Sequence, residues 1–210
     1  MRLFLVRHGE TEFNRQGLAL GREDVPLNET GQRQARLVAT ALAGEPLAAV
    51  YSSPLRRCLD TAGPIAAAHG LEVRVLPELV EMDIGEAEGL TYAQVRERYP
   101  DILGRWLGGE DLSLRPLGGE SLPQVQERAW NAIARLTRVH GQESVAVVTH
   151  NFVILALLTR ALGMPIASFR RLRHSVGAIS VLELDGESVT VWRLNDTCHL
   201  RADDGKGWLP

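Results

Sequence analysis

The chain has 210 residues, of which 45% are hydrophobic and 23% are charged, and its formal net charge is −3. This composition is typical of a globular protein and excludes intrinsic disorder and collagen-like structure. The small net charge provides no global basic field for nucleic acid, so any anion site must be local. No apolar run approaches the ~20 residues of a membrane span, and charged residues come too early for a signal peptide, so we expect a cytoplasmic protein with no membrane partner.

Three short apolar runs predict buried strands that end where polar residues begin. They cover residues 2–7, 47–51 and 144–149. The second run is followed by Ser53 and Pro54, a good cap and first-turn pair for a helix, and the third by a nearly all-apolar helix over residues 151–162. A strand, a tight turn and a helix form the repeating unit of α/β folds.

Other patterns predict the remaining elements in chain order. An amphipathic helix runs from about Asn28 to Leu42, and a short strand covers 72–75. Capping boxes open helices at Thr91 and Ser121. Residues 178–184 and 188–194 form a hairpin of one or two edge strands. We expect an α/β protein, a three-layer α/β/α sandwich with a mostly parallel central sheet. It forms a single domain over residues 1–210, with a loose tail at 201–210.

Polar side chains follow the predicted parallel strands. Arg7 and His8 follow the first strand, two arginines follow the second, and His150 follows a later one. Ligands of open α/β sheets bind outside the carboxyl ends of the strands, so we expect these side chains to share one rim. Guanidinium groups and helix amino termini match the oxygens of a phosphate group. No carboxylate-rich cage for Mg²⁺ accompanies them, so we expect phosphoryl chemistry without a metal or other cofactor.

A histidine among arginines is suited to covalent chemistry. Neighbouring guanidinium groups disfavour the imidazolium ion and lower the pKa of the ring, which keeps it neutral and nucleophilic. One histidine can then accept a phosphoryl group, while the other and the arginines stabilise charge on the phosphate oxygens. A carboxyl group must protonate the leaving alcohol, and the segment from Glu78 to Thr91 contains several candidates.

Several motifs in one order resemble those of the histidine phosphatase superfamily, also called phosphoglycerate-mutase-like. They are LVRHGETEFN at 5–14, PLNETG at 26–31, YSSPLRRCLDTA at 51–62, EMDIGEAEG at 81–89, GGES at 118–121 and VVTHN at 147–151. The resemblance extends over the chain up to about residue 195. It implies the phosphoglycerate-mutase-like fold, with residues 90–118 as an insertion on the substrate side.

The resemblance also implies a role for each matching residue. His8 matches the nucleophile that becomes phosphohistidine, and Glu81 matches the general acid and base. The rest of the catalytic phosphate pocket matches Arg7, Arg57 and His150, with Arg57 preferred to its neighbour Arg56 because Thr-Ala follows it at the family's spacing. The further phosphate- and substrate-binding residues that we expect are Asn14, Gly21 and Asn151.

Departures from the family pattern bear on the substrate. Leu20 and Ala87 stand where the family often has glutamine and tryptophan, which implies a more apolar or more open wall. SSPLRR, GGESL and LNDTCHL at 194–200 are similar to metal-independent phosphoserine phosphatases, but Ile84 replaces a histidine that faces their substrate. Phosphoserine is therefore one candidate beside sugar phosphates, phosphoglycerate derivatives, ribazole phosphate and a broad range of esters.

Three functions remain open at this point. The first is a metal-independent phosphomonoesterase that hydrolyses a small phosphorylated metabolite through a phosphohistidine on His8. The others are a bisphosphoglycerate-dependent mutase, against which the short segment between Gly89 and Gly118 speaks, and a catalytically silent regulator that binds phospholigands. A homodimer through an edge strand is a possible assembly. We expect His174 and His199 to be surface or hydrogen-bonded structural residues.

Overall fold

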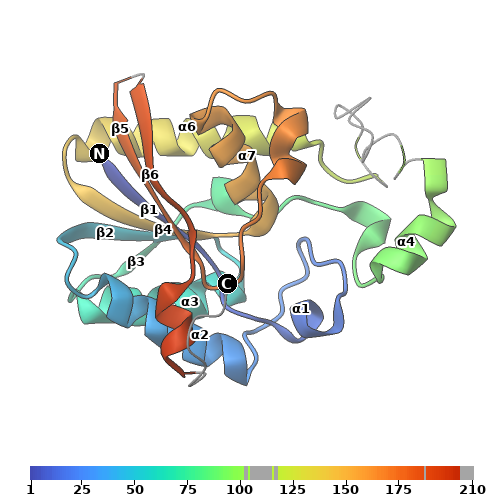
Figure 1. The fold of residues 1–210 in the computed structure, drawn as a ribbon, viewed down its shortest axis with the longest axis horizontal. Helices are drawn as coiled ribbons and strands as arrows, with labels where there is room; N and C mark the ends of the chain where they lie inside the picture. Colours follow the sequence, from blue (N-terminus) through green and yellow to red (C-terminus); the bar gives the residue numbers. More distant parts are fainter. Residues whose placement is uncertain (102–103, 105–114, 116–117, 187, 204–210) are drawn as a thin grey trace.

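A six-stranded sheet forms the middle layer of this computed structural model, which describes residues 1–101, 104, 115, 118–186 and 188–203 (Figure 1). The strand order is β3-β2-β4-β1-β5-β6. The strands are β1 (Arg2–Arg7), β2 (Leu47–Ser52), β3 (Val73–Val75), β4 (Ser144–Thr149), β5 (Ile179–Asp185) and β6 (Ser188–Asp196). β1 to β4 are parallel, and β5 lies antiparallel between β1 and β6. The mostly parallel sheet is confirmed.

Helices cover both faces of the sheet, which confirms the three-layer sandwich. The long helices are α2 (Glu29–Leu42), α3 (Arg56–Ala68), α6 (Leu122–His140) and α7 (Asn151–Ala161). Figure 1 shows α6 and α7 on one face and α2 and α3 on the other. The shorter elements are α1 (Glu12–Gln16), α4 (Tyr92–Arg98), and the 3-10 segments η1 (Pro77–Leu79), η2 (Gly85–Ala87), η4 (Ile166–Arg171) and η5 (Cys198–Asp203). None of the described helices is long and apolar enough to cross a membrane.

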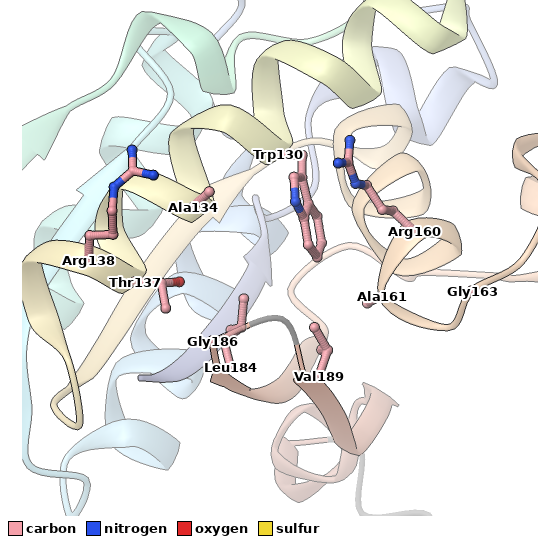
Figure 2. Close-up of a pocket in the computed structure, with 10 residues that line it drawn as sticks. All are labelled: Trp130, Ala134, Thr137, Arg138, Arg160, Ala161, Gly163, Leu184, Gly186 and Val189. Carbon is pink, nitrogen blue, oxygen red and sulfur yellow. The ribbon is translucent and has the colours of Figure 1, made fainter.

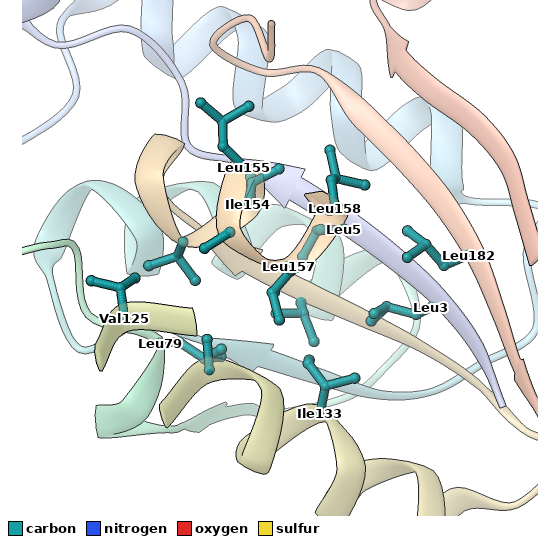
Figure 3. Close-up of a cluster of buried hydrophobic side chains, with 14 of the residues drawn as sticks. Leu3, Leu5, Leu79, Val125, Ile133, Ile154, Leu155, Leu157, Leu158 and Leu182 are labelled. Atoms are coloured by element: carbon teal, nitrogen blue, oxygen red, sulfur yellow. The ribbon is translucent and has the colours of Figure 1, made fainter. Parts of the chain in front are cut away.

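The two hydrophobic cores follow from the alternation of side chains along the strands. In β1, Leu3 and Leu5 point towards α6 and α7, where they pack with Ile133 (Figure 3). Phe4 and Val6 point to the opposite face and pack with residues of α2 and α3. A strand buried on both faces must be apolar at every position, which is why the predicted strand runs are continuous rather than alternating.

The structure corrects one helix start and leaves some predicted segments undescribed. α3 begins at Arg56 with Leu55 as its cap, whereas we expected Ser53 and Pro54 to open it. Ser53 Oγ contacts His150 instead, because β2 and β4 are neighbours. The predicted loose tail at 201–210 begins with residues of η5, and its remainder at 204–210 lies outside the described residues. Most of the segment 99–118 also lies outside them, beyond α4.

Candidate active site

The two histidines of the predicted site are brought together by the pairing of β1 with β4. Arg7 and Thr149 are opposite one another in register, and the His8 backbone N–H donates to the Thr149 carbonyl across 3.1 Å. The rings of His8 and His150 consequently lie with their centroids 5.2 Å apart at an interplanar angle of 61°. Both residues are buried at the carboxyl ends of their strands.

The tautomer of His8 is set by its own loop. Nδ1 lies 2.7 Å from the Gly9 carbonyl oxygen, and because a carbonyl can only accept, Nδ1 carries the hydrogen. Burial lowers the pKa of His8 well below its ordinary value, and the charges of Arg57 and Arg7 lower it further. The neutral ring therefore has its lone pair on Nε2. A Cβ at Gly9 would meet the Gly31 carbonyl at 2.5 Å, so the loop can pass α2 this closely only with glycine there.

Arg57 is fully buried at the start of α3 and is fixed by three acceptors. Its terminal nitrogens donate to the carbonyls of Glu23 and Gly21 at 2.7 and 2.6 Å. Its Nε donates to Nδ1 of His150 at 3.2 Å, so Nε2 of His150 carries the hydrogen and donates to Ser53 Oγ at 2.7 Å. Burial, followed by the charge of Arg57, lowers the pKa of His150, so this ring is also neutral.

Arg7 brings a second, half-buried guanidinium to the same rim. One terminal nitrogen, Nη1, donates to Asn151 Oδ1 at 3.2 Å and to the His174 carbonyl oxygen. Its Nε is buried and has no partner among the described residues. Burial lowers the pKa of Arg7 to about 10, so it stays charged at neutral pH. A buried donor without an acceptor is costly, and this one belongs to a group that binds phosphate well.

Glu81 is the buried carboxyl group of the site. Its Oε1 accepts from the Met82 N–H at 2.8 Å, and its Oε2 accepts from the Phe152 N–H at 3.3 Å. Burial raises the pKa of Glu81, although these hydrogen bonds and the charges of Arg57 and Arg7 oppose the rise. A carboxyl group whose pKa is raised can hold the proton that a leaving alkoxide needs.

The three remaining predicted residues make different contacts. Asn151 contacts Arg7 and is the first residue of α7. Gly21 contacts Arg57 through its carbonyl, but its N–H donates to Glu88 Oε1 at 2.7 Å and so is already engaged. Asn14 completes the capping box of α1 through its amide oxygen, which accepts from the N–H and hydroxyl of Thr11.

Sequence reasoning missed several contacts of the site. Ser53 and the thiol of Cys58 both contact His150, the latter with Sγ 3.4 Å from Nε2. Burial raises the pKa of Cys58, so its thiol stays protonated and packs in the core. The hydroxyl of Thr61 accepts from the Gly9 N–H at 3.1 Å and so supports the nucleophile loop. The motif SSPLRRCLDTA contains all three residues. In the sequence, however, Ser53 resembles a helix cap, and Thr61 serves only to distinguish Arg57 from Arg56.

A hollow of about 850 Å³ lies elsewhere, between α6, α7 and the turn that joins β5 to β6 (Figure 2). The guanidinium of Arg160 lies 4.8 Å from the centre of the Trp130 ring that lines it. Leu184 lines it too, and its carbonyl accepts from the amino terminus of Met1. The hollow is therefore at the end of β1 opposite to Arg7, and the described residues that line it include no histidine or carboxylate.

Within the described ranges, no group of three or more histidine, cysteine, aspartate or glutamate side chains is placed to hold a metal ion. The charged groups that act on His8 are instead the guanidinium groups of Arg57 and Arg7, which match an anion.

Comparison with known proteins places this geometry in context. Phosphoserine phosphatase 1 of Hydrogenobacter thermophilus is 35% identical over 200 residues, covering 95% of this chain and 94% of that protein. Adenosylcobalamin/alpha-ribazole phosphatase of Escherichia coli is 31% identical over 195 residues, covering 93% and 96%. The solved structure of Bacillus stearothermophilus YhfR superposes with a TM-score of 0.88 at 29% identity, covering 95% of this chain and 98% of that one.

A family model describes almost the whole chain. The model of the histidine phosphatase superfamily (branch 1) matches residues 3–197, which include every strand of the sheet and each residue of the buried cluster. A phosphohistidine intermediate is characteristic of this family. The fold, the paired histidines with their two arginines, and this match together show that the chain belongs to the histidine phosphatase superfamily.

Proposed function

We propose that the protein is a phosphoric monoester hydrolase that needs no metal ion and acts on a small phosphorylated metabolite through a phosphohistidine at Nε2 of His8. One observation carries the proposal: the hydrogen bond from Nδ1 to the Gly9 carbonyl leaves Nε2 as the free nucleophilic nitrogen of a ring that burial and the charges of Arg57 and Arg7 keep neutral. Relatives that are named as phosphatases support hydrolysis over mutase activity. The complete set of reacting groups supports catalysis over a silent binding role.

The first half-reaction transfers the phosphoryl group to His8. Nε2 attacks phosphorus, the bond from phosphorus to the ester oxygen breaks, and the protonated Glu81 carboxyl gives its proton to that oxygen. Arg7, Arg57 and the N–H groups at the start of α7 stabilise the charge on the equatorial oxygens. The products are the free alcohol and phosphohistidine, and Glu81 is left as a carboxylate.

The second half-reaction returns the enzyme to its starting state. The Glu81 carboxylate takes a proton from a water molecule, whose oxygen attacks the phosphorus of phosphohistidine. The nitrogen–phosphorus bond breaks, inorganic phosphate leaves, and Glu81 is protonated again for the next substrate. Arg7 remains charged throughout, because its lowered pKa is about 10.

The substrate is proposed only as a class. The named relatives act on phosphoserine and on adenosylcobalamin or α-ribazole phosphate, so the family's phosphate pocket accepts very different alcohols. Here Ile84 and Ala87 are buried apolar residues near the site's edge, where a Cβ on Gly21 would meet Ile84 at 2.8 Å. An apolar wall favours an ester whose alcohol carries apolar surface over phosphoserine.

A panel of phosphate esters tests the proposal. Phosphate release is measured with EDTA present for phosphoserine, 3-phosphoglycerate, sugar phosphates, ribazole phosphate and p-nitrophenyl phosphate, with His8→Ala as the control. We expect turnover of at least one physiological ester that is unaffected by EDTA and lost in the variant. Turnover that EDTA abolishes, or isomerisation that exceeds phosphate release when a bisphosphate is supplied, would contradict it.

We also propose a cytoplasmic protein that forms a two-fold homodimer through β6. This edge strand has nine residues, and its Trp192 and Leu194 are 62% and 43% exposed, which is unusual for an unprotected edge. Antiparallel pairing of two β6 strands would satisfy the backbone groups of this edge and would place both side chains beside cross-strand neighbours. Light scattering at micromolar concentration should show a dimer for the wild type and a monomer for Trp192→Glu. Fractionation of the host cell tests the location.

A further inference from the structure

We propose that the segment from Asn195 to Leu200, which begins with the last two residues of β6, positions Arg7 and the nucleophile loop by holding residues 174–177 in place. These four residues, called here the bracing loop, lie between η4 and β5. The inference deepens the proposed function and rests on it, since it concerns the phosphate pocket of the same site. None of the proposed catalytic residues lies in this segment.

Backbone groups of the bracing loop contact both the side chain of Arg7 and the backbone of Arg7 and His8. The His174 carbonyl accepts from the guanidinium of Arg7, and its position therefore sets where that group points. The Gly177 N–H donates to the carbonyls of His8 and Arg7, at 3.0 and 3.2 Å. Next to the loop, the Ala178 carbonyl accepts from the Arg7 N–H at 3.2 Å. A shift of this loop would therefore move both Arg7, the last residue of β1, and His8, which follows it.

The bracing loop is in turn held by residues 195–200. The Oδ1 of Asn195 accepts from the Ser175 N–H at 2.6 Å. The Nε2 of His199 lies 2.9 Å from the Gly177 carbonyl, and it must be the donor because a carbonyl only accepts. Leu200 closes the same turn, since a Cβ on Gly177 would lie 3.3 Å from its Cδ1. Gly177 has a φ of +68°, so the turn also requires glycine there.

A buried serine joins the two ends of this arrangement. Ser180 Oγ in β5 accepts from the Asn195 N–H at 3.0 Å and lies 2.9 Å from Nε2 of His174. Burial lowers the pKa of His174 to about 3, so this ring stays neutral over any working pH. The loop, β5 and Asn195 are therefore one hydrogen-bonded unit, and the carbonyl that binds Arg7 is part of it.

The backbone of Asn195 adopts a conformation that is unusual for a residue with a side chain. Its φ is +51°, and within the described ranges no other residue except glycine has a positive φ. L-residues seldom adopt this conformation, and when it persists the surroundings must hold it in place. Asparagine tolerates it better than most residues, and glycine would relieve it completely. Glycine would, however, lack the amide oxygen that holds Ser175.

The test compares Asn195→Gly with Asn195→Asp. Glycine keeps the backbone conformation and deletes the acceptor, whereas aspartate keeps an acceptor in the same place. We expect Asn195→Gly to weaken the binding of inorganic phosphate, measured by calorimetry, and to lower kcat/KM, each on the order of tenfold, because a small misplacement of Arg7 suffices. Asn195→Asp should restore most of both. Thr190→Ala, an exposed change in the same strand, should leave both unchanged.

A second comparison shows whether the effect passes through Arg7. In an Arg7→Ala background the guanidinium that the bracing loop holds is gone, so Asn195→Gly should weaken phosphate binding by no more than about twofold further. A tenfold effect in both backgrounds would overturn the inference, as would unchanged phosphate affinity in a folded Asn195→Gly protein. If that variant did not fold, His199→Ala and His199→Gln would replace it, since glutamine can donate to the Gly177 carbonyl and alanine cannot.

Phosphate binding also separates this inference from the proposed function. If the wild type hydrolysed no ester but bound phosphate in a manner that depended on Asn195, the hydrolase proposal would fail and the positioning role would stand. If the wild type hydrolysed esters and Asn195→Gly did so equally well, the reverse would hold. If the wild type neither bound phosphate nor hydrolysed any ester, both would be overturned.

Discussion

The Nε of Arg57 donates to Nδ1 of His150 across 3.2 Å, and this contact fixes the tautomer of a histidine that is buried beside the nucleophile. The ring must then present its hydrogen from Nε2, where Ser53 accepts it. Burial lowers the pKa of His150, so Arg57 supplies the positive charge of this pair and His150 supplies orientation. If His150 were also protonated, it and Arg57 would be two buried cations close together, which would repel one another and would lack counter-charges.

We therefore predict that Arg57→Lys lowers kcat by about 100- to 1,000-fold, the usual effect of removing one well-placed donor to a developing anion. Lysine keeps the charge but cannot reach two carbonyls and the His150 ring with a rigid fork. Steady-state kinetics on the best ester of the panel measures the effect. Arg56→Lys is the matched control, because Arg56 is the exposed neighbour whose contact is Asp60. Equal losses in both variants would count against the assignment of Arg57.

A phosphorylated intermediate should be trapped on His8. Rapid quenching of the wild type with ³²P-labelled ester under alkaline conditions, in which phosphohistidine survives, should yield labelled protein, and His8→Ala should yield none. His150→Asn should still become labelled, more slowly, because it retains the nucleophile and loses only a neighbouring ring. Label that persisted in His8→Ala would place the nucleophile elsewhere.

The core between the sheet and α6 should dominate the stability of the fold. Ile133 is 1% exposed and packs against β1, so Ile133→Ala should lower the free energy of unfolding by about 2–5 kcal/mol through lost burial and the cavity left behind. Val139 lies on the same helix but is 71% exposed, so Val139→Ala should change it by no more than about 0.5 kcal/mol. Urea titrations followed by circular dichroism compare the two variants.

The ends of the parallel strands could be predicted from the sequence because burial on both faces leaves an unbroken apolar run. Each run stops where the backbone leaves the sheet, so Arg7, His8 and His150 stood out as polar residues at strand ends. Family spacing then distinguished Arg57 from Arg56. The position of β5 between β1 and β6 could not be predicted, because strand order is set by pairing between distant segments.

Contacts made by loops were beyond sequence reasoning for a related reason. Ser53 resembles a helix cap in the sequence, yet its hydroxyl faces His150, which is 97 residues away in the chain. His174 was expected to be a structural residue, and its ring is one, but its carbonyl binds Arg7. A backbone carbonyl carries no signature in the sequence, so only the folded loop could show this role.

Glu81 should control both the pH dependence of turnover and the choice of leaving group. Burial raises its pKa, so the proton needed by the leaving oxygen is present at low pH and is lost as the pH rises through this raised value. We predict that kcat for an alkyl phosphate falls on this alkaline limb, and that Glu81→Gln removes the limb along with most of the activity. The pH profile of kcat measures both effects.

The same residue gives a sharper test with p-nitrophenyl phosphate, whose leaving group is a weak base that departs without a proton. Glu81→Gln should then form phosphohistidine at nearly the wild-type rate but hydrolyse it slowly, because no carboxylate remains to activate water. Stopped-flow absorbance should show a burst of p-nitrophenol, followed by a slow steady state. Glu78→Gln is the control, since Glu78 pairs with Arg135 at the surface and should leave both phases unchanged. A missing burst with slow turnover of both ester types would mean that Glu81 acts in phosphoryl transfer itself rather than as a proton carrier.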